Sequence, residues 1–255
     1  MRILVSLIFG LLAAAAAHAE EPLAPGGTLR VAFLKTNPAQ ALRNVGTGEY
    51  HGVAIDLAQA LALKQKLPFE LKPLDNPQQV IEAVSKGEAD IGFVAPNAER
   101  TGPVSFTRTY MLVQQTFLVK ADSAIQSVAD IDKSGNRIGA NKGDSIAFYL
   151  KQNLKNAELV ENPDFTLLEA KEQLAAGKVQ AFGANRQRLT QAARGAAEYR
   201  ILPDNLYGVP QAIAVANGKP EALKLLDAFL MEAKSSGTLK QSIDKSGVVG
   251  ISVAE

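Results

Sequence analysis

The fold of this chain is decided by residues 87–110, which read GEADIGFVAPNAERTGPVSFTRTY. Within this stretch the short apolar run Ile91–Ala95 is typical of a buried strand, and a polar turn that carries Arg100 follows it directly. Ligands of open α/β sheets bind beyond the carboxyl ends of the strands, so Ala95 and Arg100 are candidate binding residues. The planar guanidinium of Arg100 would match a carboxylate with two parallel hydrogen bonds. Alternatively, Arg100 is a solvated side chain or a structural ion-pair partner of Glu99.

On the N-terminal side of this stretch, predicted strands and helices alternate. The expected elements are a strand at Leu29–Leu34, a helix between Gly52 and Pro68, a strand at Phe69–Lys72 and a helix between Pro77 and Gly87. Asn76 is placed to cap the second helix, in which proline occupies the favoured first position. This order predicts a parallel sheet with helical crossovers.

A second alternating unit follows the stretch. Its expected strands are Thr116–Lys120, Arg137–Ala140, Leu159–Val160, Val179–Phe182 and Arg200–Leu202. Its expected helices are Ser127–Ile131, Asp144–Leu154, Phe165–Ala176 after a cap at Asp164, and one between Asn185 and Gly195. A last strand, Pro210–Val215, precedes an amphipathic helix between Pro220 and Gly237. The residues alone therefore predict two α/β lobes.

Composition restricts the function. Residues 1–19 have the apolar core and the Ala17-His18-Ala19 ending of a cleavable signal peptide, and residues 20–27 are predicted to be a flexible N-terminus. The chain has 27 basic and 26 acidic residues, and the leader removes only Arg2, which leaves 26 of each. This balance indicates neither nucleic acid nor an anionic membrane as a partner. There is no cysteine for a lipid anchor or a disulfide, and His51 alone cannot build a multi-histidine metal site.

The apolar strand and the Glu99-Arg100 turn resemble the polar amino-acid family of periplasmic solute-binding proteins (solute-binding protein family 3), the receptors of ABC importers. The resemblance implies an α/β fold of the type II periplasmic binding protein kind. Such a fold has two lobes, each a mostly parallel sheet flanked by helices, and two hinge crossings join them. The implied lobe 1 is discontinuous, residues 28–114 plus 209–255, and the implied lobe 2 is residues 115–208. The crossings are expected near Tyr110–Gln114 and Tyr207–Gln211.

In this family the arginine grips the carboxylate of a small ligand, and a Gly-Thr or Gly-Ser helix start adds a second anion contact. Here the corresponding segment, Gly139–Ser145, includes Asn141 and ends in Asp144 and Ser145. Asp144 either caps the helix or accepts a hydrogen bond from an ammonium or amide of the ligand. Because Asp144 would repel a carboxylate, this helix start is less suited to anions than those of the family.

Asn185 follows a predicted strand at the place where amino-acid receptors commonly carry an aspartate for the α-ammonium of the ligand. A neutral amide accepts a weaker hydrogen bond, and the alternative role of Asn185 is a helix N-cap. Asn37, Gln40 and Asn76 stand where the family often has aromatic side chains, which indicates a small and polar ligand; their alternative is turn and cap chemistry.

Two further candidates, Tyr110 and Gln211, lie near the expected crossings, where a structural role is the alternative. We predict a monomeric periplasmic protein that closes on a small polar solute and delivers it to the permease of an ABC importer, with no catalytic residue, metal or cofactor. One alternative is a periplasmic lyase of the cyclohexadienyl dehydratase kind, with Asp144 or Glu169 as the cleft acid. The other is a sensor or binding module without a transporter.

Overall fold

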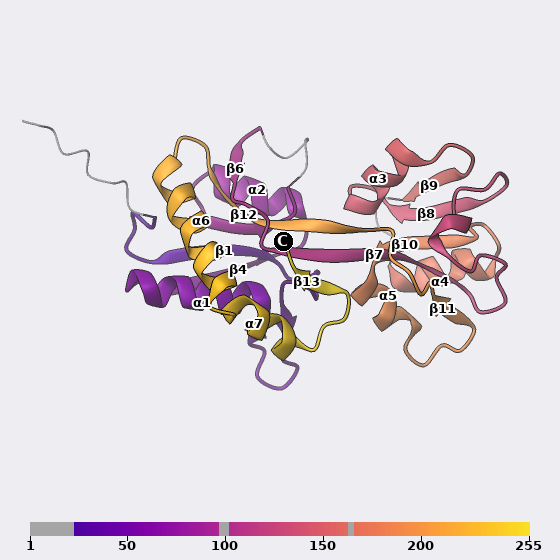
Figure 1. Cartoon of the computed structure of the whole chain (residues 1–255), viewed down its shortest axis with the longest axis horizontal. Coiled ribbons are helices and arrows are strands. Elements are labelled where there is room, and N and C mark those ends of the chain that lie inside the picture. Colours follow the sequence, from indigo (N-terminus) through magenta and orange to yellow (C-terminus); the bar gives the residue numbers. More distant parts are fainter. Residues whose placement is uncertain (1–22, 97–101, 163–165) are drawn as a thin grey trace, which may run out of the picture.

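The computed structural model describes residues 23–96, 102–162 and 166–255. Figure 1 shows two lobes side by side, each with helices packed around strands, connected by two long strands. We call the part built on strands β1, β4 and β5 lobe 1 and the part built on β8, β9 and β10 lobe 2. The α/β fold class and its two crossings are confirmed. No helix in the described part of the chain is long and apolar enough to cross a membrane.

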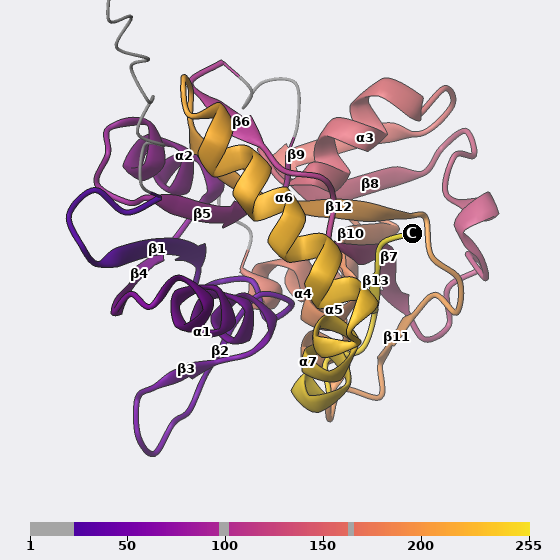
Figure 2. The ribbon, with the colours of Figure 1, turned by 60° about the vertical axis from the view of Figure 1, so that its left-hand side comes forward.

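Lobe 1 is built on three parallel strands, β1 (Leu29–Leu34), β4 (Phe69–Leu74) and β5 (Ile91–Val94). Alternate residues of a strand point to opposite faces of the sheet, so Val31 and Phe33 join one core and Ala32 another. The first core is covered by α1 (Val53–Gln65), α6 (Pro220–Ser235) and α7 (Thr238–Ser246), which lie over one side of lobe 1 in Figure 2. The second core is covered by α2 (Pro77–Ser85).

Lobe 2 repeats this plan with parallel strands β8 (Arg137–Asn141), β9 (Glu158–Asn162) and β10 (Ala181–Asn185). Helix α3 (Ser145–Asn153) packs on one core, beside the 3-10 turn Val128–Asp130. Helices α4 (Leu167–Ala175) and α5 (Arg186–Ala193) pack on the other core. Helices α2, α3, α4 and α5 each follow the carboxyl end of a parallel strand, which is where a ligand would meet them.

The two crossing strands are β7 (Met111–Lys120) and β12 (Tyr207–Ala216), and they pair with each other antiparallel from Tyr207↔Gln115 to Gln211↔Met111. Beyond this shared segment, β7 continues into lobe 2 beside β10 and β11 (Tyr199–Ile201). In the other direction β12 continues into lobe 1 beside β5 and β6 (Val104–Phe106). Each crossing strand therefore belongs to the sheets of both lobes.

Most predicted strands and helices are confirmed, with the largest differences where pairing is not local. The crossing strands begin at Met111 and Tyr207, several residues before the predicted Thr116 and Pro210, because each pairs with the other along the extra length. The elements that the sequence did not predict are a hairpin of β2 (Leu42–Arg43) and β3 (Tyr50–His51), β6, α7 and β13 (Ile251–Val253).

The cap of α4 also differs from the prediction. Asp164 and Phe165 lie outside the described residues, and the helix begins at Leu167. Its cap is Thr166, whose hydroxyl accepts from the backbone N–H of Glu169, while the Glu169 carboxylate accepts from the N–H of Thr166. This reciprocal pair satisfies donors that the start of the helix would otherwise leave open.

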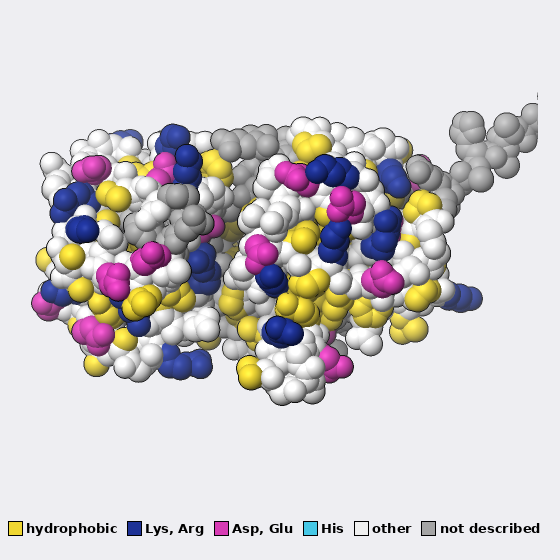
Figure 3. Space-filling model, turned by 180° about the vertical axis from the view of Figure 1, so that it is seen from behind, with side chains coloured by type: hydrophobic (Ala, Val, Ile, Leu, Met, Phe, Trp, Pro, Cys, Tyr) yellow, Lys and Arg dark blue, Asp and Glu magenta, His cyan; other side chains and the backbone are white. Residues whose placement is uncertain are grey.

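Acidic and basic side chains are interspersed over the face shown in Figure 3, on both lobes. Exposed ion pairs of the chain include Lys86–Glu82 and Lys240–Asp244. A more buried pair joins Arg30 to Asp90, whose side chain is 3% exposed, with Nη2 2.7 Å from Oδ1. This pair ties β1 to the start of β5 and holds the pKa of Arg30 above its ordinary value through the hydrogen bond with Asp90.

Candidate ligand-binding cleft

A cavity of about 830 Å³ lies between the two lobes. We call it the interlobe cavity. Lobe 1 lines it with Leu34, Thr36, Asn37, Asp75, Asn76, Pro77, Gln78 and Ala95, and lobe 2 with Asn141, Lys142, Gly143, Asp144, Ser145, Phe148, Thr166, Asn185 and Arg188. Most of these residues follow the carboxyl end of a parallel strand, so both sheets direct their strand ends at one space.

The crossing strands contribute Val113, Gln115, Val209 and Gln211 to the same cavity. Gln115 is 5% exposed and donates to the carbonyl of Val113, whereas Gln211 is 3% exposed and donates to the carbonyl of Pro210. These amides are held by the backbone of the strands that connect the lobes. The base of the cavity is therefore part of the hinge.

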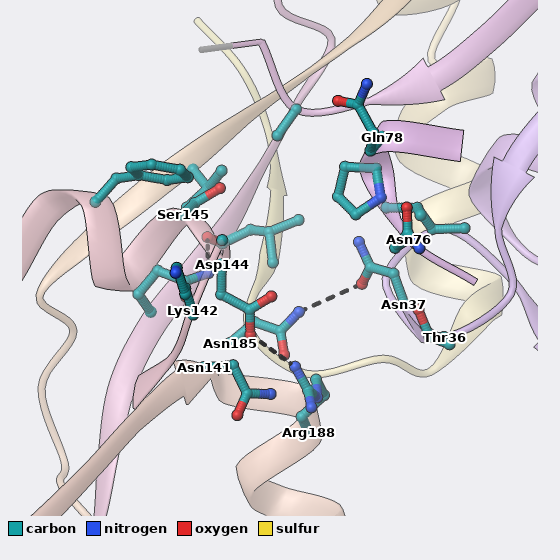
Figure 4. Close-up of a pocket in the computed structure, with 18 of the residues that line it drawn as sticks. Thr36, Asn37, Asn76, Gln78, Asn141, Lys142, Asp144, Ser145, Asn185 and Arg188 are labelled. Atoms are coloured by element: carbon teal, nitrogen blue, oxygen red, sulfur yellow. Dashed lines mark hydrogen bonds and ion pairs between the residues drawn. The ribbon is translucent and has the colours of Figure 1, made fainter. Parts of the chain in front are cut away.

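Asn37 makes the side-chain contact between the walls. Its Oδ1 accepts from the backbone N–H of Ala39 at 3.1 Å, which holds the amide in one orientation. The same oxygen accepts from Asn185 Nδ2 at 3.4 Å (Figure 4) and from Gln187 Nε2, also at 3.4 Å. The side-chain oxygens of Asn185 and Gln187 are buried and have no hydrogen-bond partner among the described residues. Amide groups from both lobes thus meet at one edge of the cavity.

The wall of lobe 2 is charged. Arg188 Nη1 lies 3.0 Å from Asp144 Oδ2, an ion pair between α5 and the start of α3. Lys142 lines the same wall two residues before Asp144. Among the described residues of this wall, two cations and one carboxylate give a formal charge of +1, which favours an anionic group of a ligand.

Tyr207 contacts the start of α3 from the crossing strand β12. Its hydroxyl donates to the carbonyl of Ser145 at 2.8 Å, and its ring stacks on Tyr149 with centroids 4.4 Å apart. Burial raises the pKa of the Tyr207 hydroxyl, so it stays a protonated donor at neutral pH. A residue of a crossing strand therefore positions the part of α3 that faces the cavity.

Eight of the predicted site residues line the interlobe cavity: Asn37, Asn76, Ala95, Asn141, Asp144, Ser145, Asn185 and Gln211. Arg100 lies outside the described residues. Asn76 also caps α2 as predicted, because its side chain accepts from the N–H of Gln79. Asp144 and Asn185 occupy N-cap positions without making a side-chain capping bond.

Two predicted contacts do not line the cavity. Gln40 is fully buried behind its wall, where it accepts from the N–H of Leu34 and donates to Gln211 Oε1 at 3.0 Å. Tyr110 is 2% exposed and packs edge-on against Phe93 inside the core of lobe 1. Both side chains turn inward because the adjacent core and backbone offer them partners.

Sequence reasoning missed Arg188, Lys142, Thr36, Asp75 and Gln115, all of which line the cavity. A local signal existed for Arg188. It lies three residues after Asn185 on a predicted helix, a spacing that places two side chains on the same face.

Two α/β lobes, joined by two strands and enclosing a polar cavity, define a solute-binding protein of the type II periplasmic fold. The sequence matches bacterial extracellular solute-binding proteins, family 3, over residues 29–247. The chain therefore belongs to this family, and its function is to bind a solute outside the cytoplasm.

Named proteins are similar along most of the chain. The glutamine-binding protein of Geobacillus stearothermophilus is 31% identical over 180 residues, which cover 69% of this chain and 67% of that protein. An ancestral arginine-binding protein bound to arginine is 28% identical with a TM-score of 0.69, covering 86% of this chain and 97% of that one. The ancestral amino acid-binding protein AncCDT-1, a precursor of cyclohexadienyl dehydratase, is 26% identical with a TM-score of 0.68 and covers 86% and 94%.

Proposed function

We propose that this protein captures a small polar amino acid in the interlobe cavity and delivers it to the membrane permease of an ABC importer. The observation that carries the proposal is the lining itself, in which charged and amide side chains from both lobes surround one space of about 830 Å³. Cavities of roughly 300–1,000 Å³ suit small-molecule ligands. The names of the similar proteins, which include glutamine- and arginine-binding proteins, support an amino acid as the ligand.

Hinge closure is the mechanism we propose. Residues 28–114 with 209–255 would move as one body and residues 115–208 as the other, about the paired segment of β7 and β12. A ligand that contacts both walls binds the closed form more tightly than the open form, and this difference in affinity drives closure. The permease would then recognise the closed form.

Binding is better supported than catalysis. Of the two acids that a lyase could use, Asp144 is ion-paired with Arg188. Glu169 does not line the cavity, and hydrogen bonds from the backbone and hydroxyl of Thr166 hold its pKa below the ordinary value. A general acid at neutral pH needs a raised pKa, the opposite direction.

We also propose export through the leader of residues 1–19 and a monomeric state in the periplasm. The leader has the composition of a cleavable signal peptide. The absence of cysteine is compatible with a periplasmic protein whose stability comes from its packed cores.

A thermal-shift screen of the twenty L-amino acids, followed by calorimetry, tests the ligand class. Binding to the folded state raises the melting temperature by mass action, so a cognate ligand should give a concentration-dependent increase. Small dicarboxylates, polyamines and prephenate serve as comparison compounds. A response to none of the amino acids would refute the proposed ligand class, and consumption of prephenate would favour the lyase.

A further inference from the structure

Arg188 has more hydrogen-bonding capacity than the protein uses. Its side chain is 24% exposed, and it lines the interlobe cavity. Among the residues that the structure describes, its only partner is Asp144, reached through Nη1. Nε and Nη2 therefore keep donors that no described protein group accepts.

These donors belong to a partly exposed side chain that lines the interlobe cavity, so a ligand that displaces solvent there must accept from them. A guanidinium cannot lose its charge in a protein, so its remaining N–H groups need an acceptor. Leaving a charged donor without a partner away from water costs more free energy than leaving a neutral one. A ligand in the cavity is the acceptor that this geometry calls for.

The charge of the surroundings indicates which kind of acceptor fits. On the lobe 2 wall, Lys142 and Arg188 outnumber Asp144, so an anionic oxygen is attracted to this side. On the lobe 1 wall the carboxylate of Asp75 lies 2.9 Å from Lys35 Nζ and adds no net charge. A carboxylate of the ligand is therefore directed toward lobe 2.

Asp144 gives Arg188 a fixed orientation. Its carboxylate, just after the glycine turn at Gly143, lies 3.0 Å from Arg188 Nη1 and so holds the guanidinium. Three residues earlier on the same helical face as Arg188, Asn185 has a buried oxygen without a described partner. Arg188 thus supplies hydrogen-bond donors and Asn185 supplies an acceptor oxygen. This arrangement fits a ligand that carries a carboxylate next to an N–H group.

We propose that Arg188 binds the carboxylate of the ligand from lobe 2 and that Asp144 is its positioning residue. The inference rests on the proposed function, because it specifies how an amino acid is held in the same cavity. The contact through Arg188 on α5 is distinct from the contact predicted for Arg100.

The test compares acids with their amides. Calorimetry measures the affinity of the whole protein for L-glutamine, L-arginine and L-lysine and for the α-carboxamide of each, which lacks the carboxylate. In Arg188→Gln we expect the affinity for the acids to fall by at least about tenfold, and the affinity for the amides to change by less than about twofold. Arg194→Gln, at the other end of α5 and outside the cavity, is the matched control and should change neither.

A double variant distinguishes a direct contact between Arg188 and the ligand carboxylate from neutralisation of Asp144 by Arg188. If Arg188 only neutralises Asp144, the double variant Asp144→Asn with Arg188→Gln should recover the wild-type affinity for the acids. If Arg188 holds the carboxylate, the double variant stays weak. Asp144→Asn alone should reduce the ratio of acid to amide affinity, which a loss of stability by itself would leave unchanged.

The outcomes also distinguish the two proposals. If the wild type binds none of the twenty L-amino acids, the proposed function fails and this inference fails with it. If the wild type binds an acid and Arg188→Gln binds it equally well, or if the double variant recovers full affinity, only this inference is overturned. Circular dichroism of each variant checks that it is folded.

Discussion

Asn185 donates a hydrogen bond of 3.4 Å from its side-chain nitrogen to the side-chain oxygen of Asn37, which joins the two lobes at the edge of the interlobe cavity. Gln187 donates to the same oxygen at 3.4 Å. The residues are separated by 148 and 150 positions in the sequence, so this contact exists only when the lobes face each other. The contact therefore couples the relative position of the two lobes to the ligand-binding site.

Asn37→Ala should favour the open form, because it removes the one acceptor that these two donors share. Neutral hydrogen bonds contribute about 0.5–1.5 kcal/mol each, so we expect ligand affinity to weaken by roughly 1 kcal/mol. Small-angle scattering of the ligand-free variant should give a larger radius of gyration than the wild type. Ser105→Ala, on β6 away from the cavity, is the control, and equal radii for Asn37→Ala and the wild type would contradict the expectation.

Gly183→Ala should destabilise lobe 2 and weaken ligand binding together. A Cβ at this position would lie 2.7 Å from Ile146 Cδ1 and 3.0 Å from Phe117 Cε1, so these side chains or the elements that carry them must shift. Overpacking of this kind costs about 1–3 kcal/mol, to be measured by urea denaturation. Because β10 leads directly into Asn185, the shift reaches the cavity.

A matched substitution exists at Gly102, where an added Cβ meets nothing within 4 Å. Gly102→Ala should leave both stability and affinity close to those of the wild type. If the two alanine variants behave alike, the steric explanation for Gly183 is wrong.

Tyr110→Phe should leave stability unchanged or raise it. The hydroxyl of Tyr110 is buried without a hydrogen-bond partner among the described residues, and burial raises its pKa. Removing an unsatisfied buried polar group eliminates its desolvation penalty. Chemical denaturation should therefore show no loss, and ligand affinity should not change because Tyr110 does not line the cavity.

Tyr207→Phe also removes one hydroxyl, but the expected effect on stability is the opposite. It removes a hydroxyl that donates to Ser145 O at 2.8 Å, so a loss of about 1 kcal/mol is expected. A greater loss in Tyr110→Phe than in Tyr207→Phe would be inconsistent with the hydrogen bonding described above.

Asp132 should contribute to stability in a pH-dependent way. Its carboxylate accepts from the backbone N–H groups of Ala157 and Asn156, at 2.9 and 2.8 Å, and these bonds lower its pKa below the ordinary value. A lowered folded-state pKa stabilises the protein above the unfolded-state value of about 4, and this stability is lost as the pH falls through the folded-state pKa. Asp132→Asn should therefore melt below the wild type at pH 7.

The difference in melting temperature should shrink toward zero as the pH approaches about 2, because the protonated carboxyl of the wild type then resembles the amide. Circular dichroism melts from pH 7 to pH 2 measure it directly. A difference that stays constant over this range would show that Asp132 acts by packing and not through its charge.

Local sequence patterns predicted the order of strands and helices and the end of the sheet at which the strands finish. Those properties depend on neighbours in the chain. Asn76 and Pro77 begin α2, the apolar run Ile91–Val94 forms a buried strand, and Asn141 and Asn185 end parallel strands. Because ligands of α/β sheets bind at the carboxyl ends of strands, candidates that follow such ends could be placed at the cavity from the sequence, whereas Gln211 was placed there by the family resemblance.

Which side chains meet in the cavity depends on long-range packing. The Arg188–Asp144 pair, the amide contact of Asn37 with Asn185 and Gln187, and the burial of Gln40 behind the wall all join segments that are distant in the sequence or turn a loop residue inward. The same holds for the extra length of the crossing strands, since Met111–Gln115 of β7 pair with Tyr207–Gln211 of β12. Local propensity does not specify such partners, because they depend on how two separately packed cores are set against each other.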